Sequence, residues 1–147
     1  NMLSCDLQII TETFSNNNLF VSEKIFKPII MCQPFIILGS NKIYKHLQEL
    51  GYNTFDYLID THKLDTTMNN ITKIVIVCDA IQRLKDIKSN PIEWKKLQDK
   101  ISIDVIHNYN LFVSNLSTIK ENSALGLHEF LEIRPGYKLP LQNKEDK

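Results

Sequence analysis

The residues best suited to chemistry lie in the segment SEKIFKPI, residues 22–29. Ser22 is a preferred helix N-cap, and the free N–H groups and partial positive charge of a helix start attract phosphate. Lys24 and Lys27 add full positive charges there, and an anion would offset the unfavourable position of Lys24 in the first turn. Glu23 offers two acceptor oxygens for the vicinal hydroxyls of a ribose. The segment therefore predicts an amide-lined mouth at residues 22–24 that holds pyrophosphate.

Each of these residues also has a plainer interpretation. Ser22 and Glu23 are explained by helix capping alone, with the lysines pointing to water. Lys27 can form an i,i+4 pair with Glu23. Glu12 follows the first predicted strand, where it could face a sugar or ribose or be a surface carboxylate at a strand end. The sequence leaves these alternatives open.

The elements that must position these residues follow a β-α-β-α order. Residues 7–11 predict a buried strand, and residues 23 to about 32 predict a helix that Pro28 should kink or shorten. Residues 34–38, PFIIL, predict a strand buried on both faces, and residues 41–50 a helix closed by Gly51. Such an order places Glu12 and residues 22–24 at the carboxyl ends of parallel strands, where open α/β sheets bind ligands.

The rest of the chain is predicted to be mainly helical. Residues 51–60 predict a short strand or turn with Phe55 and Leu58 inward. Helices are expected over residues 65–87, from residue 91 to about 112 with Asn90 as N-cap, and over residues 118–131. The apolar positions expected to face inward in the first of these helices are Ile71, Ile74, Val75, Cys78, Ile81 and Leu84.

These elements divide the chain into three expected parts. Residues 1–62 form a Rossmann-like segment that binds a nucleotide-sugar, residues 63–134 a helical extension packed on it, and residues 135–147 a polar tail. Two clear strands are too few for an independent sheet buried on both faces. We therefore expect the remaining N-terminal part of a longer chain to supply the missing strands.

Composition restricts the class of protein further. The 147 residues carry 17 basic and 17 acidic side chains, so no overall charge favours nucleic acid or a membrane surface. Cys5, Cys32 and Cys78 have neither disulfide-framework nor zinc-site spacing. The apolar runs are too short to cross a bilayer, and no signal peptide is evident. We expect a cytoplasmic α/β protein with no nucleic-acid partner and no membrane span.

A family resemblance supports the nucleotide interpretation. The sequences ITETF, LFVSEKIFKPIIMCQPFIILGS and LQELGYNTFDYLID, within residues 10–58, resemble the C-terminal region of bacterial and viral glycosyltransferase-like proteins. SIDVIHNYNLF, residues 102–112, resembles the same family. The pair Glu23 and Lys24, followed by a helix and a strand that ends in Gly39, is similar to the donor-binding half of fucosyltransferase-type GT-B enzymes. The family pattern has Thr where this chain has Ser22 and Ile25.

The resemblance implies a partial Rossmann-like parallel sheet of the GT-B C-terminal type that binds a nucleotide-diphosphate sugar. It implies that Glu23 contacts the ribose and that Lys24 meets the diphosphate, with Ser22, Lys27 and Glu12 as further donor-binding candidates. GT-B enzymes usually need no metal, and this chain has no DxD pair. The family's acceptor-activating base belongs to the other domain, so no catalytic residue is assigned and the acceptor is unknown.

Two other classes of function remain open. The chain could be a non-catalytic viral or interaction domain that has kept the fold, or a different Rossmann-like ligand binder, although no GxGxxG or Walker loop supports the latter. His107, in HNYN, is a possible general base, but a histidine inside a helix is more often structural. His46, His62 and His128 have no metal-ligand spacing with one another.

Overall fold

The computed structural model describes residues 7–12 and 21–122 of the chain. The chain divides into two compact units, Asn1–Val113 and Ser114–Lys147. The first unit holds the sheet and almost all of the described helices. The described part of the second unit is the C-terminal end of the last helix, and the expected tail from residue 135 lies outside the described residues.

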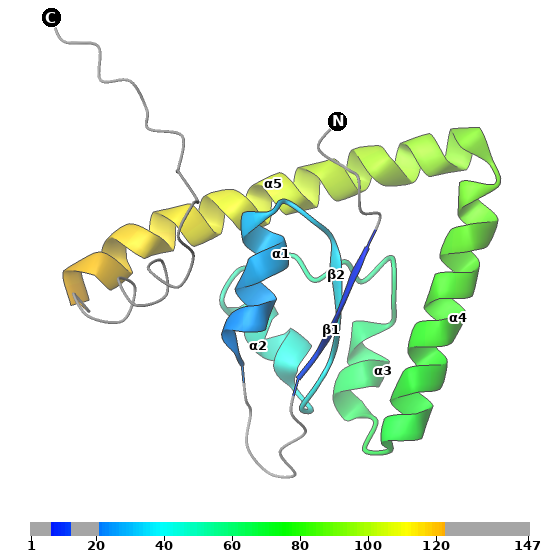
Figure 1. Ribbon diagram of the computed structural model, residues 1–147, viewed down its shortest axis with the longest axis horizontal. Coiled ribbons are helices and arrows are strands. Elements are labelled where there is room, and N and C mark those ends of the chain that lie inside the picture. The colour runs from blue at the N-terminus through cyan, green and yellow to red at the C-terminus, as the bar shows by residue number, and fades with distance from the viewer. Residues whose placement is uncertain (1–6, 13–20, 123–147) are drawn as a thin grey trace, which may run out of the picture. The chain divides into compact units, whose positions relative to one another are not determined.

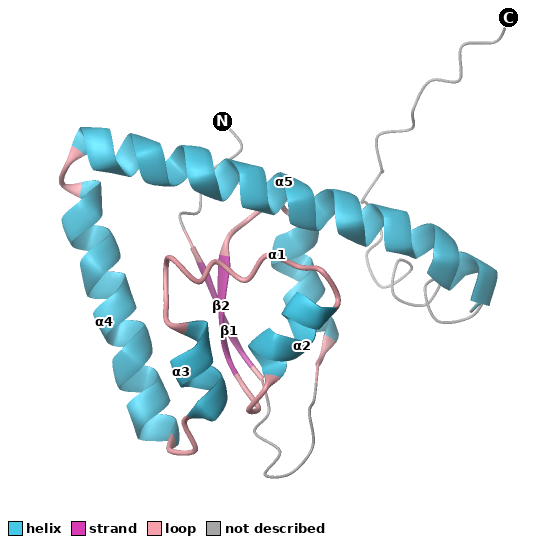
Figure 2. Ribbon diagram, turned by 180° about the vertical axis from the view of Figure 1, so that it is seen from behind, coloured by secondary structure: helices cyan, strands magenta, loops and turns pink. Residues whose placement is uncertain are grey.

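The sheet consists of two parallel strands, β1 (Gln8–Thr11) and β2 (Phe35–Leu38), which the sequence predicted. Their register runs from Gln8 opposite Phe35 to Thr11 opposite Leu38. Phe35, Ile36 and Ile37 are all buried although they alternate between the two faces, so β2 is covered on both sides. Figures 1 and 2 show the strands between α1 on one side and α3 and α4 on the other. The first unit is therefore a mixed α/β structure.

The segment between the strands is irregular, as expected from the position of Pro28 within the predicted helix. A 3-10 turn, η1 (Glu23–Ile25), is followed by a short helix, α1 (Phe26–Ile30). Because the α-helix begins only at Phe26, Pro28 falls within its first turn, where a missing N–H breaks no intrahelical hydrogen bond. The expected helix is thus divided and ends earlier than Cys32, which has a left-handed φ of 50°.

The next helix, α2 (Ile43–Glu49), confirms the helix expected before Gly51. Gly51 has a φ of 90° and donates its N–H to Gln48 O at 2.9 Å, as a glycine just after a helix typically does. Residues 51–60 form turns and no strand, and Phe55 and Leu58 are buried as predicted.

The helix expected over residues 65–87 is two helices, α3 (Thr61–Thr66) and α4 (Asn70–Lys88). Asn69 separates them because its side chain caps α4, accepting from Ile71 N at 2.8 Å and Thr72 N at 3.1 Å. The predicted inward face was wrong at four of its six positions, whereas Ile81 and Leu84 are partly buried against the core. The expected core position Ile71 is 73% exposed, and Ile74, Val75 and Cys78 are exposed as well. The buried residues of α4 are Lys73, Ile76, Val77 and Ala80.

The last helix, α5 (Pro91–Asn122), begins at the predicted N-cap. The Asn90 side chain accepts from Ile92 N at 3.1 Å. The helix then continues to residue 122, so the helices expected to end near residue 112 and to begin near residue 118 are one element in the described range. Within the first unit, Ile101 and Val105 pack into the core.

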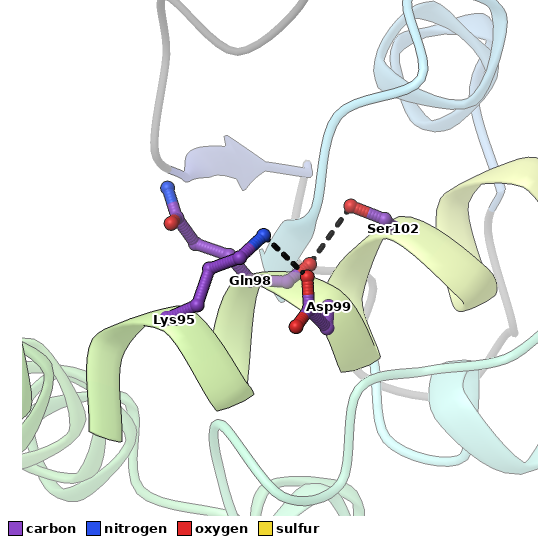
Figure 3. A network of polar contacts seen from close by, with 4 residues as sticks. All are labelled: Lys95, Gln98, Asp99 and Ser102. Carbon is purple, nitrogen blue, oxygen red and sulfur yellow. Dashed lines mark hydrogen bonds and ion pairs between the residues drawn. The ribbon is translucent and has the colours of Figure 1, made fainter. Parts of the chain in front are cut away.

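Two contacts along α5 are local to the helix, one exposed and one half-buried. Figure 3 shows Lys95 paired with Asp99 at 2.7 Å and the Ser102 hydroxyl bonded to Gln98 O at 2.8 Å. Exposed i,i+4 pairs of this kind contribute less than about 1 kcal/mol. Among the described helices, none combines the length and apolar character needed to cross a membrane.

Candidate ligand site at the carboxyl edge of the sheet

The carboxyl ends of β1 and β2 meet at one edge of the sheet, here called the carboxyl edge. The strand ladder continues beyond β1, because Glu12 N donates to Leu38 O at 2.8 Å. A Cβ at Gly39 would lie 3.1 Å from Glu12 Cβ, which is closer than side chains normally approach. Gly39 therefore makes room for the Glu12 side chain between the two strand ends.

Glu12 and Ser22 form a buried hydrogen-bonded pair at the carboxyl edge. Glu12 is only 3% exposed, and its Oε1 accepts from Ser22 Oγ at 2.5 Å and from Ser22 N at 3.3 Å. Ser22 Oγ in turn accepts from Lys24 N at 3.3 Å, which confirms the predicted N-cap. The prediction that Glu12 lies at the same edge as residues 22–24 is confirmed, whereas an exposed carboxylate at a strand end is not what the structure shows.

The expected amide-lined mouth at residues 22–24 is already filled in part by the protein. Ser22 N donates to Glu12, Lys24 N donates to Ser22 Oγ, and Ile25 N donates to Ser22 O at 3.3 Å. The expectation that the amides of residues 22–24 are free for a phosphate was therefore wrong for Ser22 and Lys24. A carboxylate from the end of β1 occupies the position where we expected an external anion, and the helices behind the amides are too short to carry a large dipole.

Glu23, Lys24 and Lys27 have exposed side chains. Lys24 Nζ lies 3.4 Å from Thr11 O, so its ammonium group is at the carboxyl end of β1. The alternative pairing of Glu23 with Lys27 is not formed in the described part of the structure. The three charged groups are thus accessible to solvent. Lys24, which contacts the backbone of β1, lies at the carboxyl edge.

Lys73 is a component of this edge that the sequence analysis missed. It is only 3% exposed, and its Nζ donates to Gly39 O and to Asn41 Oδ1, both at 2.8 Å. Burial lowers the pKa of its ammonium group, while the nearby Asp65 carboxylate acts in the opposite direction. In the sequence Lys73 is one lysine in a helix with apolar residues all round, so no local signal marks it.

Asp65 fixes the other end of the loop at residues 39–42. Its carboxylate accepts from Tyr44 N at 3.1 Å and Lys45 N at 2.8 Å, so it caps α2 from a distant position. The local N-cap, Lys42, has a left-handed φ of 69° and makes no side-chain cap. Burial raises the pKa of Asp65, and the two amides and Lys73 oppose that effect. The loop that follows β2 is therefore held by side chains from both α3 and α4.

Among the described residues, two buried side-chain oxygen atoms at the carboxyl edge lack hydrogen-bond partners. They are Glu12 Oε2 and Ser40 Oγ, the latter in the loop held by Lys73. Because more than about nine in ten buried polar groups are satisfied in native proteins, such atoms indicate unused hydrogen-bonding capacity. The edge thus combines a carboxylate, hydroxyls and lysines on preformed loops.

The other polar groups of interest serve the structure elsewhere. His107 Nε2 lies 2.9 Å from Gly51 O, at the far end of α2 from the carboxyl edge, which gives the histidine a structural contact. A hollow surrounding the start of α3 contains none of the predicted site residues; it is lined by Asp56, Ile59, Asp60, Thr61, His62 and Arg83. Within the described ranges, no three His, Cys, Asp or Glu side chains are grouped as metal ligands would be.

The chain matches no protein-family model, no curated protein and no solved structure. What the fold and the site define is a mixed α/β protein with a polar cluster at the carboxyl edge of a parallel sheet.

Proposed function

We propose that the chain is the donor-binding, C-terminal part of a nucleotide-sugar-dependent glycosyltransferase with a Rossmann-like fold of the GT-B type. In this proposal it acts in glycosyl transfer to an acceptor hydroxyl. The observation that carries the proposal is the position of the Lys24 ammonium group at the carboxyl end of β1, beside the buried pair of Glu12 and Ser22. Ligands of open α/β sheets bind at this edge.

The diphosphate is recognised mainly by side chains in this proposal. Negative charge develops on the β-phosphate as the glycosyl group leaves, and a nearby ammonium group stabilises it. Lys24 supplies that charge, and Lys27 provides a second cation on the following turn. Glu23 accepts hydrogen bonds from the ribose hydroxyls.

Glu12 and Ser22 have a positioning role in this scheme. Their buried hydrogen bonds fix the backbone of residues 22–24, from which the Glu23 and Lys24 side chains project. A charged group held in place loses less entropy on binding its ligand than a free one. Glu12 Oε2 is buried without a hydrogen-bond partner, so it would accept from a hydroxyl of the ribose or the sugar only once the surrounding residues move to admit the ligand. The acceptor-activating base comes from the remaining N-terminal part of a longer chain, and no catalytic residue is assigned.

Nucleotide titration tests the proposal. Addition of GDP, UDP, CDP and ADP to the 15N-labelled chain should shift the amide signals of residues 22–24 for at least one nucleotide. Lys24→Ala should weaken that binding by about tenfold or more, as expected for the loss of a charge-assisted hydrogen bond. Lys95→Ala is the matched control, because it removes the same charge from an exposed site on α5. If Lys24→Ala and Lys95→Ala bind the nucleotide with equal affinity, Lys24 does not bind the diphosphate.

One observation favours the second candidate, a non-catalytic viral or interaction domain with a glycosyltransferase-like fold. The amides of Ser22, Lys24 and Ile25 already have internal partners, so part of the expected phosphate site is closed. This candidate predicts that none of the four nucleotides shifts any signal although the amide spectrum is that of a folded chain. A response to ADP alone would favour a different nucleotide-binding protein.

A further inference from the structure

The loop that joins β2 to α2, residues 39–42, has a shape that its own sequence does not favour. Lys42 has a left-handed φ of 69°, a conformation that is strained for a residue other than glycine. Lys42 is also the N-cap of α2, and its side chain caps no amide of that helix. The shape of the loop is therefore imposed by contacts from elsewhere in the fold.

Two buried charged side chains hold the loop, one at each end. Lys73 Nζ, on α4, donates to Gly39 O and to Asn41 Oδ1, both at 2.8 Å. The carboxylate of Asp65, on α3, accepts from two amides in the first turn of α2, one with each oxygen. Residues that are more than 20 positions further along the sequence thus set the position of the loop.

Stability alone accounts poorly for these two charges. Lys73 is 3% exposed and Asp65 is 9% exposed. Burial lowers the pKa of Lys73 and raises the pKa of Asp65, so it disfavours the charged form of both residues. Apolar side chains of similar size often stabilise a protein as well as buried charges do, or better. Strained backbone that the surrounding structure holds in place is typical of ligand sites. The combination therefore indicates that the conformation of the loop serves binding.

The loop lies where the proposed nucleotide binds. It follows β2 at the carboxyl edge, and a Cβ at Gly39 would lie 3.1 Å from Glu12 Cβ. Ser40, the next residue, is 5% exposed, and its Oγ is one of the two buried oxygens that lack a partner among the described residues. Ligands of open α/β sheets bind just beyond the carboxyl ends of the strands. A ligand at this edge therefore meets residues 39–42 in the conformation that the two buried charges hold.

We propose that Lys73 and Asp65 are positioning residues that hold the loop at residues 39–42 in the conformation that binds a nucleoside diphosphate. This inference rests on the proposed function, because it takes the nucleotide as the ligand of the carboxyl edge. A loop that is already in its bound shape loses less entropy when the ligand binds. The two residues thus raise the affinity without touching the ligand.

Two variants with opposite changes of charge test the proposal. Lys73→Met removes a positive charge and keeps the length of the side chain. Asp65→Asn removes a negative charge and has one acceptor oxygen, so it keeps at most one of the two amides. Titration with GDP, UDP, CDP and ADP should show that both variants bind the parent's nucleotide about tenfold more weakly or worse. A pure charge effect would instead tighten the binding of an anion by Asp65→Asn.

Lys85→Met is the matched control for the loss of a positive charge. Lys85 is exposed in the last turn of α4, the helix that carries Lys73. The control should bind the nucleotide with the affinity of the parent. If Lys73→Met does not fold, Asn41→Ala is the second variant, because it removes only the side-chain acceptor of Lys73 and should also weaken binding.

The order of the loop gives a second measurement, which needs no nucleotide. In the ligand-free parent, 15N relaxation should give order parameters of about 0.85 for the amides of residues 40–42. These values should fall to about 0.6 in Lys73→Met and stay unchanged in Lys85→Met. A purely structural role of Lys73 predicts a different result, in which the melting temperature falls while the folded variant binds the nucleotide as the parent does.

The outcomes separate this inference from the proposed function. If the parent binds none of the four nucleotides, the proposed function fails and this inference fails with it. If the parent binds a nucleotide and both variants bind it equally well, only the positioning role is wrong. That role is also wrong if Asp65→Asn binds more tightly than the parent, or if the order parameters of residues 40–42 do not change in Lys73→Met.

Discussion

Replacing Tyr44 with Phe tests whether the Tyr44 hydroxyl stabilises β2 by bonding the backbone N–H and C=O of Ile37. The substitution keeps the ring, which is buried, and deletes a hydroxyl bonded to both Ile37 N and Ile37 O. No water can replace it without opening the core, since Ile37 and Tyr44 are both fully buried. The variant should fold to the same structure with a lower free energy of unfolding.

The size of the loss follows from the two groups left without a partner. A buried donor or acceptor that loses its only partner costs about 1 to 3 kcal/mol, with carbonyl oxygens at the low end. The sum for Ile37 is about 2 to 4 kcal/mol. Since domains are stable by only about 5 to 15 kcal/mol, this is a large fraction of the total. With a urea m-value of about 2 kcal/mol/M, the unfolding midpoint should fall by about 1 to 2 M.

Urea unfolding followed by circular dichroism at 222 nm measures this change. Tyr109→Phe is the matched control, because the Tyr109 ring is exposed and its hydroxyl makes no hydrogen bond within the described residues. It should stay within about 0.5 kcal/mol of the parent. A loss of less than about 0.5 kcal/mol for Tyr44→Phe, at an unchanged m-value, would refute the stabilising role of the hydroxyl on β2.

Three further variants or conditions test other contacts. Burial raises the pKa of Tyr44 and Tyr57 above the ordinary value near 10, so their stabilising effect is complete below that pH. Above it, the free energy of unfolding should fall as the pH rises, and urea midpoints in Tyr44→Phe should show a shallower decline. Gly39→Ala should cost about 1 to 3 kcal/mol in thermal unfolding, because its Cβ would crowd Glu12. Asn108→Ala should cost about 2 to 3 kcal/mol in urea, since it removes two hydrogen bonds of 2.8 and 2.9 Å to a loop backbone.

The sequence predicted those elements whose signals are local. PFIIL is short, apolar and bounded by Gly39, and the structure makes it a strand buried on both faces. The helix α2 ends before Gly51 because the positive φ of that glycine suits the residue after a helix. The helix α5 begins after Asn90 because the Asn90 side chain caps its first turn. In these places the residues that determine the structure lie within a few positions of one another.

The orientation of α4 could not be predicted in this way. The run IVIV at residues 74–77 gives the helix apolar side chains on more than one face, so periodicity does not select the inward one. The selection follows from Lys73, whose ammonium group reaches Gly39 O and Asn41 Oδ1 more than 30 positions away in the sequence. A buried lysine turns the helix so that Ile71 faces solvent, which a pattern of hydrophobicity cannot indicate.

The candidate site was predictable in the same partial sense. Ser22 was identified as an N-cap because capping depends on the next two residues. The Ser22 amide donates to Glu12, which lies ten positions earlier and on another element. The position of Glu12 in the sequence predicted the correct edge of the sheet but could not indicate the direction of its carboxylate.

The direction of that carboxylate determines how the carboxyl edge can recognise a ligand. Backbone amides bind any anion of suitable shape, but here Glu12 and Ser22 already accept from the Ser22 and Lys24 amides, and the Glu12 carboxylate adds negative charge. An anionic ligand must therefore be attracted by the exposed Lys24 and Lys27, whose charges are screened by salt. Recognition by lysines at an exposed edge is more sensitive to ionic strength than recognition by buried amides. The affinity of the chain for a nucleoside diphosphate should accordingly fall steeply with added salt.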